Sequence, residues 1–459
     1  MNRTLPVSLI GVMAALSAYG AKNAAKSSAK TDKRPNFVII LADDLGYGDI
    51  GCFGNQTIKT PVLDRMASEG MRLTDYHSNG AVSTPTRAAL MTGRYQQRAG
   101  LEGVLTTSDN HRNAGLQPDE VTFAKVLSAN GYRTAIFGKW HLGYLPKYNP
   151  ATVHGFGEFT GFLSGNVDYK AFLDSKGRQD WWQRDSVENV AGYLTDVITR
   201  SGVDFIQRTA GEHFCLYLAH GCPHSPYQGP DDPPVRHLGV AKTGSVAGKT
   251  YEQCYKEMIE RLDLGIGKVF EALKEKGLEQ NTLVIFISDN GPTGPGSAGT
   301  LRGRKSEVFE GGHRVPGILW MPGTVKAGSV SDQTVLGMDI FPTMLEMAGI
   351  KYNGGSKPFD GMSFVPVMQG RQMPQRPLFW RTGSAKAARE GDWKYLEVGK
   401  GKKVEKYLFN LREDPSEKNN LLGENPARVE EFVRKLAAWE KSVDSETPEQ
   451  IIAGKGGAD

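Results

Sequence analysis

A serine, a proline and an arginine lie within five residues of one another in Ser83-Thr84-Pro85-Thr86-Arg87, and together they could bind an anion. A proline fixes φ and has no N–H to donate, so it suits the first turn of a helix. Ser83 would then lie at the N-terminus of that helix, where unpaired N–H groups and the helix dipole favour negative charge. Arg87 follows one turn later and can approach the same anion from the side. The alternative is an N-cap serine at the start of an ordinary surface helix.

Acidic and amide residues follow two apolar runs that lie far apart in the sequence. The two runs and the residues after them are Asn36–Ala42 with Asp43 and Asp44, and Thr282–Ser288 with Asp289 and Asn290. Continuous apolar runs predict strands buried on both faces of a parallel sheet, and ligands of such sheets gather beyond the carboxyl ends of the strands. Carboxylates that meet there repel one another unless a cation is bound, and all-oxygen ligation suits Ca²⁺ or Mg²⁺ rather than Zn²⁺. The alternative is two unrelated Asx caps.

Basic side chains follow other predicted elements. Lys139 and His141 come after the apolar run Thr134–Phe137, and on an extended backbone residues two apart project to the same side. His224 lies in the segment Pro-His-Ser-Pro, whose prolines limit the freedom of the backbone. Lys305 lies close to two arginines. Taken alone, each of these segments is typical of a solvated or packed loop.

Together these segments resemble the signature blocks of the type I, formylglycine-dependent sulfatases, in particular bacterial carbohydrate sulfatases similar to arylsulfatase A and N-acetylgalactosamine sulfatase. The resemblance runs from Pro35 to about Leu422 and includes the blocks Ala42–Asp49, Ser83–Arg94, Gly138–Gly143, Ser288–Gly291 and Glu310–Pro316. Thr86 and Arg304 depart mildly from the family pattern. The resemblance implies an alkaline-phosphatase-like α/β fold and a sulfuric ester hydrolase.

In that family the first residue of the Ser83 block, a serine or cysteine, is oxidised after translation to Cα-formylglycine, the catalytic aldehyde. The resemblance therefore implies that Ser83 is converted to Cα-formylglycine. Because the residue is a serine, it also implies a maturation enzyme of the anaerobic radical type as a partner. One Ca²⁺, in preference to Mg²⁺, is implied as well. Its implied ligands are Asp43, Asp44, Asp289, Asn290 and the converted Ser83.

The resemblance also implies roles for the basic residues. Arg87, Lys139 and Lys305 would hold the sulfate, and positive charge that surrounds a transferring group before reaction is usually a large catalytic term. The other implied roles are a hydrogen bond from His141 to the hydrated aldehyde, protonation of the leaving alcohol by His224, and removal of the attacking hydroxyl's proton by Asp289. Histidine suits such roles because it titrates near neutrality.

Two further segments, His154–Gly161 and Ser164–Tyr169, resemble those of sulfatases that act on galactose or N-acetylgalactosamine. The substrate expected from this resemblance is a sulfated saccharide of host or algal glycans, attacked in exo fashion at a galacto-configured unit. Asn166, Asp168 and Tyr169 are the predicted sugar contacts. The alternative is that these polar loop residues only face water.

Strand-like and helical patterns alternate up to about residue 370 and predict a large, mostly parallel α/β sheet flanked by helices. Besides the two apolar runs named first, the predicted strands are Thr134–Phe137, Phe214–Leu218 and Ile318–Trp320, and the predicted helices are Asp119–Asn130, Val190–Ile206 and Tyr251–Lys276. Residues 35–370 form the predicted catalytic domain.

After residue 370 the pattern changes to short strands separated by turns. The predicted strands there are Pro377–Trp380, Trp393–Val398 and Tyr407–Leu411, and a helix that begins at Pro426 follows them. That helix places apolar residues on one face, namely Val429, Phe432, Val433, Leu436 and Trp439. Residues 371–459 are thus predicted to form a small C-terminal α+β subdomain, an antiparallel sheet with one packed helix.

The composition is that of an ordinary globular enzyme. The 459 residues are 39% hydrophobic and 23% charged, and the net charge of +4 gives no support to nucleic-acid binding. Residues 1–20 combine a positive start, an apolar run and small residues, the layout of a secretory signal peptide, and residues 21–34 form a polar spacer. An N-terminal anchor helix is the alternative, but the run is short for a membrane span. We therefore expect a periplasmic or secreted protein without a membrane span.

Two other functions fit parts of this pattern. A phosphatase or phosphodiesterase of the alkaline phosphatase superfamily would need ligands for two Zn²⁺ ions, and the nine histidines show no spacing for a second metal site. A catalytically inactive, secreted glycan-binding protein would have lost at least one site residue, and each is present. The four cysteines are too few for a disulfide scaffold, and Cys215 and Cys222 either pair or stay as buried thiols.

Overall fold

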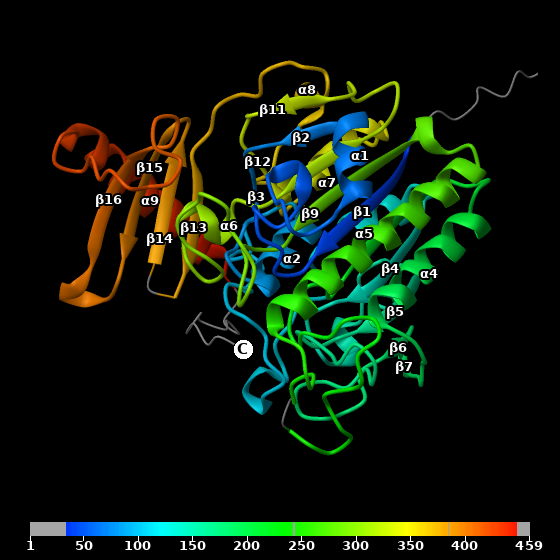
Figure 1. Cartoon of the computed structure of the whole chain (residues 1–459). Helices are drawn as coiled ribbons and strands as arrows, with labels where there is room; N and C mark the ends of the chain where they lie inside the picture. Colours follow the sequence, from blue (N-terminus) through cyan, green and yellow to red (C-terminus); the bar gives the residue numbers. More distant parts are fainter. Residues whose placement is uncertain (1–33, 242–243, 384, 448–459) are drawn as a thin grey trace, which may run out of the picture. The chain divides into compact units, whose positions relative to one another are not determined.

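A ten-stranded sheet organises most of the chain in the computed structural model, which describes residues 34–241, 244–383 and 385–447 (Figure 1). Its strand order is β11-β2-β10-β9-β1-β8-β4-β5-β6-β7. Its strands are β1 (Asn36–Ala42), β2 (Met71–Leu73), β4 (Arg133–Lys139), β5 (Glu158–Phe162), β6 (Trp182–Gln183), β7 (Ser186–Val187), β8 (Phe214–Ala219), β9 (Thr282–Ser288), β10 (Gly317–Trp320) and β11 (Ser329–Ser331). The predicted signal peptide, and the predicted spacer up to residue 33, lie outside the described residues.

The centre of this sheet is parallel, as the sequence predicts. β9, β1, β8, β4 and β5 run in the same direction, whereas β10 pairs with β9 in the antiparallel sense. The last paired residues of β1 and β9 are Ala42 and Ser288. Because these two strands end level with each other, the residues that follow them, Asp43 and Asp289, start from the same edge of the sheet.

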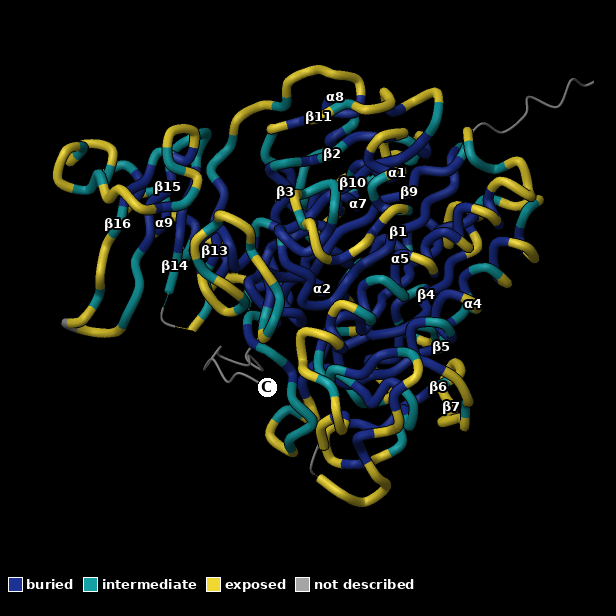
Figure 2. The backbone as a smooth tube through the Cα atoms, viewed as in Figure 1, coloured by how far each residue is buried: buried dark blue, intermediate teal, exposed yellow. Residues whose placement is uncertain are grey.

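Helices cover both faces of the ten-stranded sheet. Successive side chains of a strand point to opposite faces, and in the central strands both sets are apolar, so both faces are buried. In β1, Phe37, Ile39 and Leu41 pack on one face, Val38 and Ile40 pack on the other, and all five are fully buried. Figure 2 shows β1 and the strands around it in the dark blue of buried residues. α1, α4 and α5 lie on the Val38 face, and α2, α3 and α7 lie on the Phe37 face. The helices are α1 (Pro61–Glu69), α2 (Ser83–Thr92), α3 (Phe123–Ala129), α4 (Leu194–Arg208), α5 (Tyr251–Glu275), α6 (Glu310–His313), α7 (Ile340–Met347), α8 (Val365–Met368) and α9 (Pro426–Glu446).

α2 is buried along its whole length, which excludes the surface-helix alternative for Ser83. Ser83 is its first residue, and Pro85 lies in its first turn. The helix ends before Gly93, whose N–H donates to the carbonyl oxygen of Ala89. Gly93 has φ 68°, the left-handed conformation in which glycine commonly ends a helix. The predicted anion-binding helix start is therefore part of the core.

The second sheet has four antiparallel strands, β13 (Leu378–Thr382), β14 (Ala385–Glu390), β15 (Trp393–Val398) and β16 (Glu405–Asn410), and α9 packs against it. The sequence predicts three of these strands and misses β14, whose mixture of alanine and charged residues gives little apolar signal. Phe432, Leu436 and Trp439 of α9 are buried as predicted. Val433 is 38% exposed, because the buried face continues through Val443 instead.

A buried network of charges joins the four-stranded sheet to α6. Lys394 of β15 donates to Glu310 Oε1 at 2.8 Å and lies 3.0 Å from Glu417 Oε1. The N–H of Glu310 donates to Glu417 Oε2 at 2.7 Å. All three side chains are buried. The described residues from Arg34 onwards form one compact unit, so the domain boundary expected near residue 370 stays a prediction.

Several predicted boundaries differ from the structure. α3 begins at Phe123 rather than at Asp119, because Thr122 caps the helix by accepting from the N–H of Lys125. α4 begins at Leu194 rather than at Val190. A small parallel sheet of β3 (Tyr76–His77) and β12 (Val335–Leu336) has strands too short to predict. Over the described ranges, none of the helices combines the length and the apolar character that a membrane crossing requires.

The four cysteines are free thiols, so Cys215 and Cys222 do not form a disulfide. Both are fully buried, and burial raises the pKa of each thiol. A buried thiol with a raised pKa is unreactive, because the thiolate is the reactive form. The structure thus selects the buried-thiol alternative.

Replacing Lys394 with methionine should destabilise the fold strongly. The substitution leaves Glu417 buried without its cation and leaves Glu310 with Arg314 at 3.3 Å, and breaking a buried ion pair from one side costs about 3–5 kcal/mol. We expect the free energy of unfolding in urea to fall by that amount. Lys406→Met is the control: its side chain is 47% exposed and lies 3.5 Å from Glu397, so a loss of about 1 kcal/mol or less is expected. Equal losses in the two variants would contradict a stabilising role for the network.

Candidate active site

Three carboxylates meet where β1 and β9 end. One oxygen atom of each of Asp43, Asp44 and Asp289 lies within 4.8 Å of the other two. The N–H of Asp44 donates to Asp289 Oδ1 at 3.1 Å, and Asn290 Nδ2 donates to Asp44 Oδ1 at 2.7 Å. Asp44 has φ 64°, an uncommon conformation for a residue with a side chain and one that clusters at functional sites. The structure thus brings together the four aspartate and asparagine residues that the resemblance implies as metal ligands.

Burial and mutual repulsion perturb the pKa values of these carboxyls. Burial, and then the charge of Asp289, raises the pKa of Asp43 well above its usual value. Burial also acts to raise the pKa of Asp44, but Lys305 and His224 outweigh it and hold that pKa below its usual value. Cations outweigh burial in the same way at Asp289, whose pKa is lowered. Opposite shifts of neighbouring pKa values are typical of crowded, buried acidic groups.

Three cations from three different elements partly neutralise the carboxylates. The pairs are Lys139 Nζ with Asp43 Oδ2 at 2.7 Å, Lys305 Nζ with Asp44 Oδ1 at 2.9 Å, and an Arg87 terminal nitrogen with Asp289 Oδ2 at 3.2 Å. Lys139 is the last residue of β4, Arg87 lies in α2, and Lys305 lies in the loop before α6. Lys305 reaches the cluster even though the neighbouring Arg304 departs from the family pattern. All three predicted anion-binding residues therefore converge.

Ser83 lies between a guanidinium and an imidazole. Arg87 Nε donates to Ser83 Oγ at 2.9 Å, and His141 Nδ1 lies 3.3 Å from the same oxygen. His141 Nε2 lies 2.7 Å from the carbonyl oxygen of Leu105, so we assign the ring proton to Nε2. Burial, followed by the charge of Lys139, lowers the pKa of His141 well below its usual value. The neutral imidazole therefore accepts a hydrogen bond from Ser83 at Nδ1.

Lys139 and His141 reach the site by a different route from the one predicted. Lys139 belongs to β4 itself, and His141 has φ 56°, so the chain turns after the strand instead of staying extended. Thr84 Oγ1 donates to the carbonyl oxygen of His141 at 3.2 Å, which ties this turn to α2. Both side chains nevertheless line one cavity.

His224 lies beside Asp44 and Lys305. Its Nδ1 donates to the carbonyl oxygen of Ser225 at 2.8 Å, while its Nε2 lies 3.5 Å from Asp44 Oδ2 and 3.3 Å from Lys305 Nζ. Burial lowers the pKa of His224 to about 4. Nε2 is therefore an acceptor for Lys305. Two cis peptide bonds, Cys222–Pro223 and Ser225–Pro226, flank this histidine.

A cavity of about 610 Å³ opens onto the cluster. The predicted site residues that line it are Asp44, Ser83, Lys139, His141, Asn166, His224 and Lys305. Other polar or aromatic lining residues include Tyr144, Tyr227, Arg236, Tyr251 and Thr293. Asp43, Arg87, Asp289 and Asn290 are almost fully buried around it. An anion in this cavity would meet the ammonium groups of Lys139 and Lys305 beside Ser83.

Comparison with known proteins establishes the family. The family model described as "Sulfatase" matches residues 35–350, and the model described as "N-sulphoglucosamine sulphohydrolase, C-terminal" matches residues 304–442. The chain belongs to the sulfatase family. It is a sulfuric ester hydrolase, as the resemblance of its sequence implies.

Relatives of this sulfatase, and solved structures of proteins similar to it, agree with that result. The N-acetylgalactosamine-6-sulfatase of Mus musculus is 34% identical over 384 residues, which cover 78% of this chain and 70% of the relative. The steryl-sulfatase of Rattus norvegicus is 30% identical and covers 75% of this chain and 72% of the relative. The crystal structure of Ps i-CgsB in complex with k-i-k-neocarrahexaose is 30% identical, with a TM-score of 0.79 over 91% of this chain and 94% of that chain. The predicted fold class is thereby confirmed.

The structure places the three predicted sugar contacts of the sulfatase in different surroundings. Asn166 lines the cavity. Asp168 is fully buried, and its carboxylate accepts from the backbone N–H groups of Lys170, Ala171, Val235 and Arg236. Tyr169 is also buried, and its hydroxyl donates to the carbonyl oxygen of His224 at 2.9 Å. The prediction is therefore wrong for Asp168 and Tyr169, because their side chains hold loops around the cavity rather than lining it.

Several residues that shape the site are not among those predicted. Thr293 Oγ1 donates to Asp44 Oδ2 at 3.0 Å, and Arg87 donates to the Tyr217 hydroxyl at 3.4 Å. Thr293 follows Asp289 in the same loop, so its position in the sequence could have indicated that it belongs to the site. Tyr217 lies in an apolar strand and is typical of a core residue.

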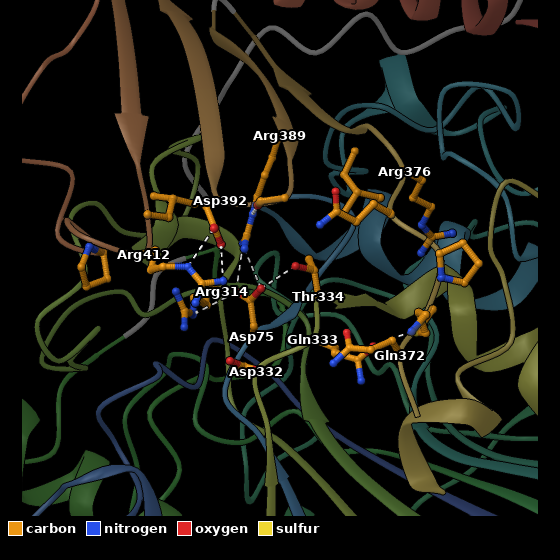
Figure 3. Close-up of a pocket in the computed structure, with 17 residues that line it drawn as sticks. Asp75, Arg314, Asp332, Gln333, Thr334, Gln372, Arg376, Arg389, Asp392 and Arg412 are labelled. Carbon is orange, nitrogen blue, oxygen red and sulfur yellow. Dashed lines mark hydrogen bonds and ion pairs between the residues drawn. The ribbon is translucent and has the colours of Figure 1, made fainter. Parts of the chain in front are cut away.

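A second cavity of about 610 Å³ is lined by loop residues such as Asp75 and Asp332 and by Leu378 of β13 and Arg389 of β14 (Figure 3). Its charged side chains pair with one another: Arg389 and Arg314 lie 2.7 and 3.4 Å from Asp75, and Arg412 lies 2.8 Å from Asp392. Its lining shares no residue with the cluster around Ser83. Because its arginines are neutralised by aspartates, it is a poorer anion site than the Ser83 cavity.

His77, Glu310 and His313 form a second group of possible metal ligands. His77 Nδ1 and His313 Nδ1 lie 2.9 Å apart, His77 Nε2 lies 2.9 Å from Asp75 Oδ1, and His313 Nε2 lies 3.2 Å from Lys394 Nζ. Each ring nitrogen thus has a protein partner, and two of them have a second: His77 Nε2 lies 3.0 Å from Arg389 Nη1, and His313 Nε2 lies 3.1 Å from the carbonyl oxygen of Val308. These ring nitrogens therefore need no metal ion.

The Asp43 cluster, by contrast, has oxygen atoms without partners. Asp43 Oδ1 and Asn290 Oδ1 are buried and have no hydrogen-bond partner in the part of the chain that the structure describes. Buried oxygens that converge without donors are the chemistry that Ca²⁺ or Mg²⁺ prefers. The residues present thus fit the divalent metal that sulfatases generally use.

Ca²⁺ should stabilise the purified sulfatase. An ion that binds only the folded state and is present at a concentration one hundred times its Kd stabilises that state by about 2.7 kcal/mol. We therefore expect Tm to rise with Ca²⁺ and to fall with a chelator. Asp289→Asn should abolish the Ca²⁺-dependent shift in differential scanning fluorimetry. Asp332→Asn, at an exposed position of the second cavity, is the matched control and should keep the shift. An undiminished shift in Asp289→Asn would mean that the ion binds elsewhere.

Proposed function

We propose that this sulfatase removes sulfate from carbohydrates by means of a Cα-formylglycine formed from Ser83 and one bound Ca²⁺. The observation that carries the proposal is the placement of Ser83 Oγ, 2.9 Å from Arg87 and 3.3 Å from His141, in a cavity that Lys139 and Lys305 also line. A serine hydroxyl is a weak nucleophile at its ordinary pKa. A hydrated aldehyde at residue 83 would supply a more reactive hydroxyl there.

Asp43, Asp44, Asp289, Asn290 and the converted Ser83 would hold the ion, which would supply positive charge beside the sulfate oxygens. The unpartnered oxygens of Asp43 and Asn290 support this assignment. Lys139 and Lys305 would hold the sulfate directly. Each ammonium group has three N–H donors, and its ion pair with Asp43 or Asp44 leaves others for the substrate.

Two histidines and one aspartate would move the protons. His141 Nδ1 already accepts from residue 83, so it would take the proton from a hydroxyl there when sulfate is released. His224 Nε2 lies next to Lys305 on the cavity wall; it would first take up a proton, which the negative charge of a bound sulfate ester favours, and would then deliver it to the leaving alcohol. Asp289, which Arg87 holds at 3.2 Å, would take the proton of the attacking hydroxyl.

The substrate that we propose is a sulfated galactose or N-acetylgalactosamine unit of host or algal glycans, attacked in exo fashion. A relative named N-acetylgalactosamine-6-sulfatase and a solved structure with bound k-i-k-neocarrahexaose support a carbohydrate of this kind. The polar side chains of Asn166 and Arg236 on the cavity wall suit a ligand rich in hydroxyl groups.

The two alternative functions have less support. A two-zinc phosphatase needs a second metal site, and the ring nitrogens of the His77 group already have hydrogen-bond partners. An inactive binding protein would lack part of the catalytic cluster, whereas Ser83, Arg87 and their predicted partners converge. We also propose that the protein is exported, to the periplasm or beyond, and that a maturation enzyme of the radical type oxidises Ser83.

Intact-mass spectrometry of the mature protein should show the loss of two hydrogens, because oxidation of a serine hydroxymethyl group to an aldehyde removes two. Tandem spectra should place the change at Ser83. Ser83→Ala should show no such loss and should release no sulfate, whereas Ser225→Ala, elsewhere on the cavity wall, should keep the modification. Sulfatase activity in protein with an unmodified Ser83 would refute the proposed nucleophile.

A panel of singly sulfated monosaccharides should identify the sugar. We expect kcat/KM for galacto-configured sulfates to exceed that for gluco-configured sulfates by a factor of about 10 or more, because a polar site that bonds a hydroxyl in one orientation rejects the other. Ion chromatography of free sulfate gives the rates. Hydrolysis of aryl sulfates alone, or of glucosamine sulfates alone, would overturn the galacto assignment and leave the family assignment intact.

A further inference from the structure

Three tyrosines form a continuous aromatic series beside the Ser83 cavity. Tyr255 is buried, and its hydroxyl lies 3.4 Å from the carbonyl oxygen of Asp44. The ring centroids of Tyr255 and Tyr227 are 5.9 Å apart, and those of Tyr227 and Tyr251 are 5.3 Å apart. Tyr251 is 55% exposed. The series thus runs from the carboxylate cluster to solvent.

The ring of Tyr251 is held in place by the elements around it. Tyr251 is the first residue of α5, and Thr250 before it forms a capping box with Gln253. Tyr255 follows one turn later on the same side of the helix, so Tyr227 packs against both rings. A ligand that stacks on Tyr251 would therefore pay little entropy to order it.

The exposure of Tyr251 is unusual for a large side chain. The other large apolar residues that are exposed in the described part of the chain are aliphatic: Val187, Leu238, Val240, Leu264, Val330 and Val433. Tyr251 differs from them because it lines the Ser83 cavity, together with the polar side chains of Asn166 and Arg236. An exposed aromatic face beside hydrogen-bonding groups matches a ligand that has one apolar face and a hydroxylated rim.

We propose that Tyr251 is a stacking platform for the sugar unit next to the sulfated one, so that the enzyme recognises an oligosaccharide rather than a single sugar. This inference rests on the proposed function. A galacto-configured pyranose has its hydrogens at carbons 3, 4 and 5 on one face, and that face is apolar. Tyr251 is the solvent-exposed end of the tyrosine series, whereas Asp44 is 1% exposed at the buried side of the same cavity, so the ring of Tyr251 meets the part of a ligand that lies nearer to solvent than the sulfated unit.

Kinetics on two matched substrates test the platform. The substrates are a sulfated galactose and a galactose trisaccharide with the same sulfate on its terminal unit. Tyr251→Ala should raise KM for the trisaccharide about tenfold with little change in kcat, since aromatic stacking contributes up to that factor. KM for the monosaccharide should stay the same. Tyr251→Phe should behave as the wild type, and Leu264→Ala, exposed on the same helix, is the matched control.

Saturation-transfer NMR can measure binding of the desulfated trisaccharide to Ser83→Ala protein, which tests the platform without catalysis. If Ser83→Ala protein binds the trisaccharide and the added Tyr251→Ala substitution abolishes that binding, the inference is supported. Failure of the wild type to hydrolyse any sulfated sugar would then count against the proposed function alone. Three outcomes would overturn the platform: no binding, equal binding with and without Tyr251, or an equal rise in KM on both substrates.

Discussion

Repulsion between carboxylates at the ends of two neighbouring strands is the constraint on which the rest of this structure depends. β1 and β9 pair in register up to Ala42 and Ser288, so Asp43 and Asp289 cannot move apart without breaking the central sheet. Two unit charges at about 4 Å in a partly polar interior interact by about 4 kcal/mol. A group of three such carboxylates folds only if positive charge, a proton or a cation is supplied from elsewhere.

Each source of positive charge requires a different part of the fold. α2 carries Arg87, the end of β4 carries Lys139, and the loop before α6 carries Lys305. That loop is fixed on both sides: the N–H of Ser306 donates to the carbonyl oxygen of Ala81 near α2, and Arg302 donates to the carbonyl oxygen of Glu417. The C-terminal sheet therefore contributes to the carboxylate cluster without being part of it, because Lys394 and Glu417 hold the segment from which Lys305 extends.

The parts of the structure that were predictable from sequence are those with a strong local signal. Long apolar runs predicted β1 and β9, and the acidic residues after them predicted the carboxylate cluster. β14 gave no such signal, because alanine and charged residues alternate in a strand that is stabilised by its neighbours. Asp168 and Tyr169 were misinterpreted for a related reason: a polar residue in a loop has the same sequence pattern whether it faces a ligand or caps backbone N–H groups. Tyr251 acquires its position only from the packing of α5 against Tyr227.

The burial of α2 has a consequence for biosynthesis. Ser83 is 2% exposed, and every other residue of its helix is buried between the sheet and neighbouring helices. The maturation enzyme that we propose would have to enclose several residues on either side of Ser83 in its own active site, and the folded helix, buried along its whole length, offers no such access. The oxidation of Ser83 that we propose would therefore have to precede the collapse of the core, so the timing of folding would set the fraction of molecules that become active.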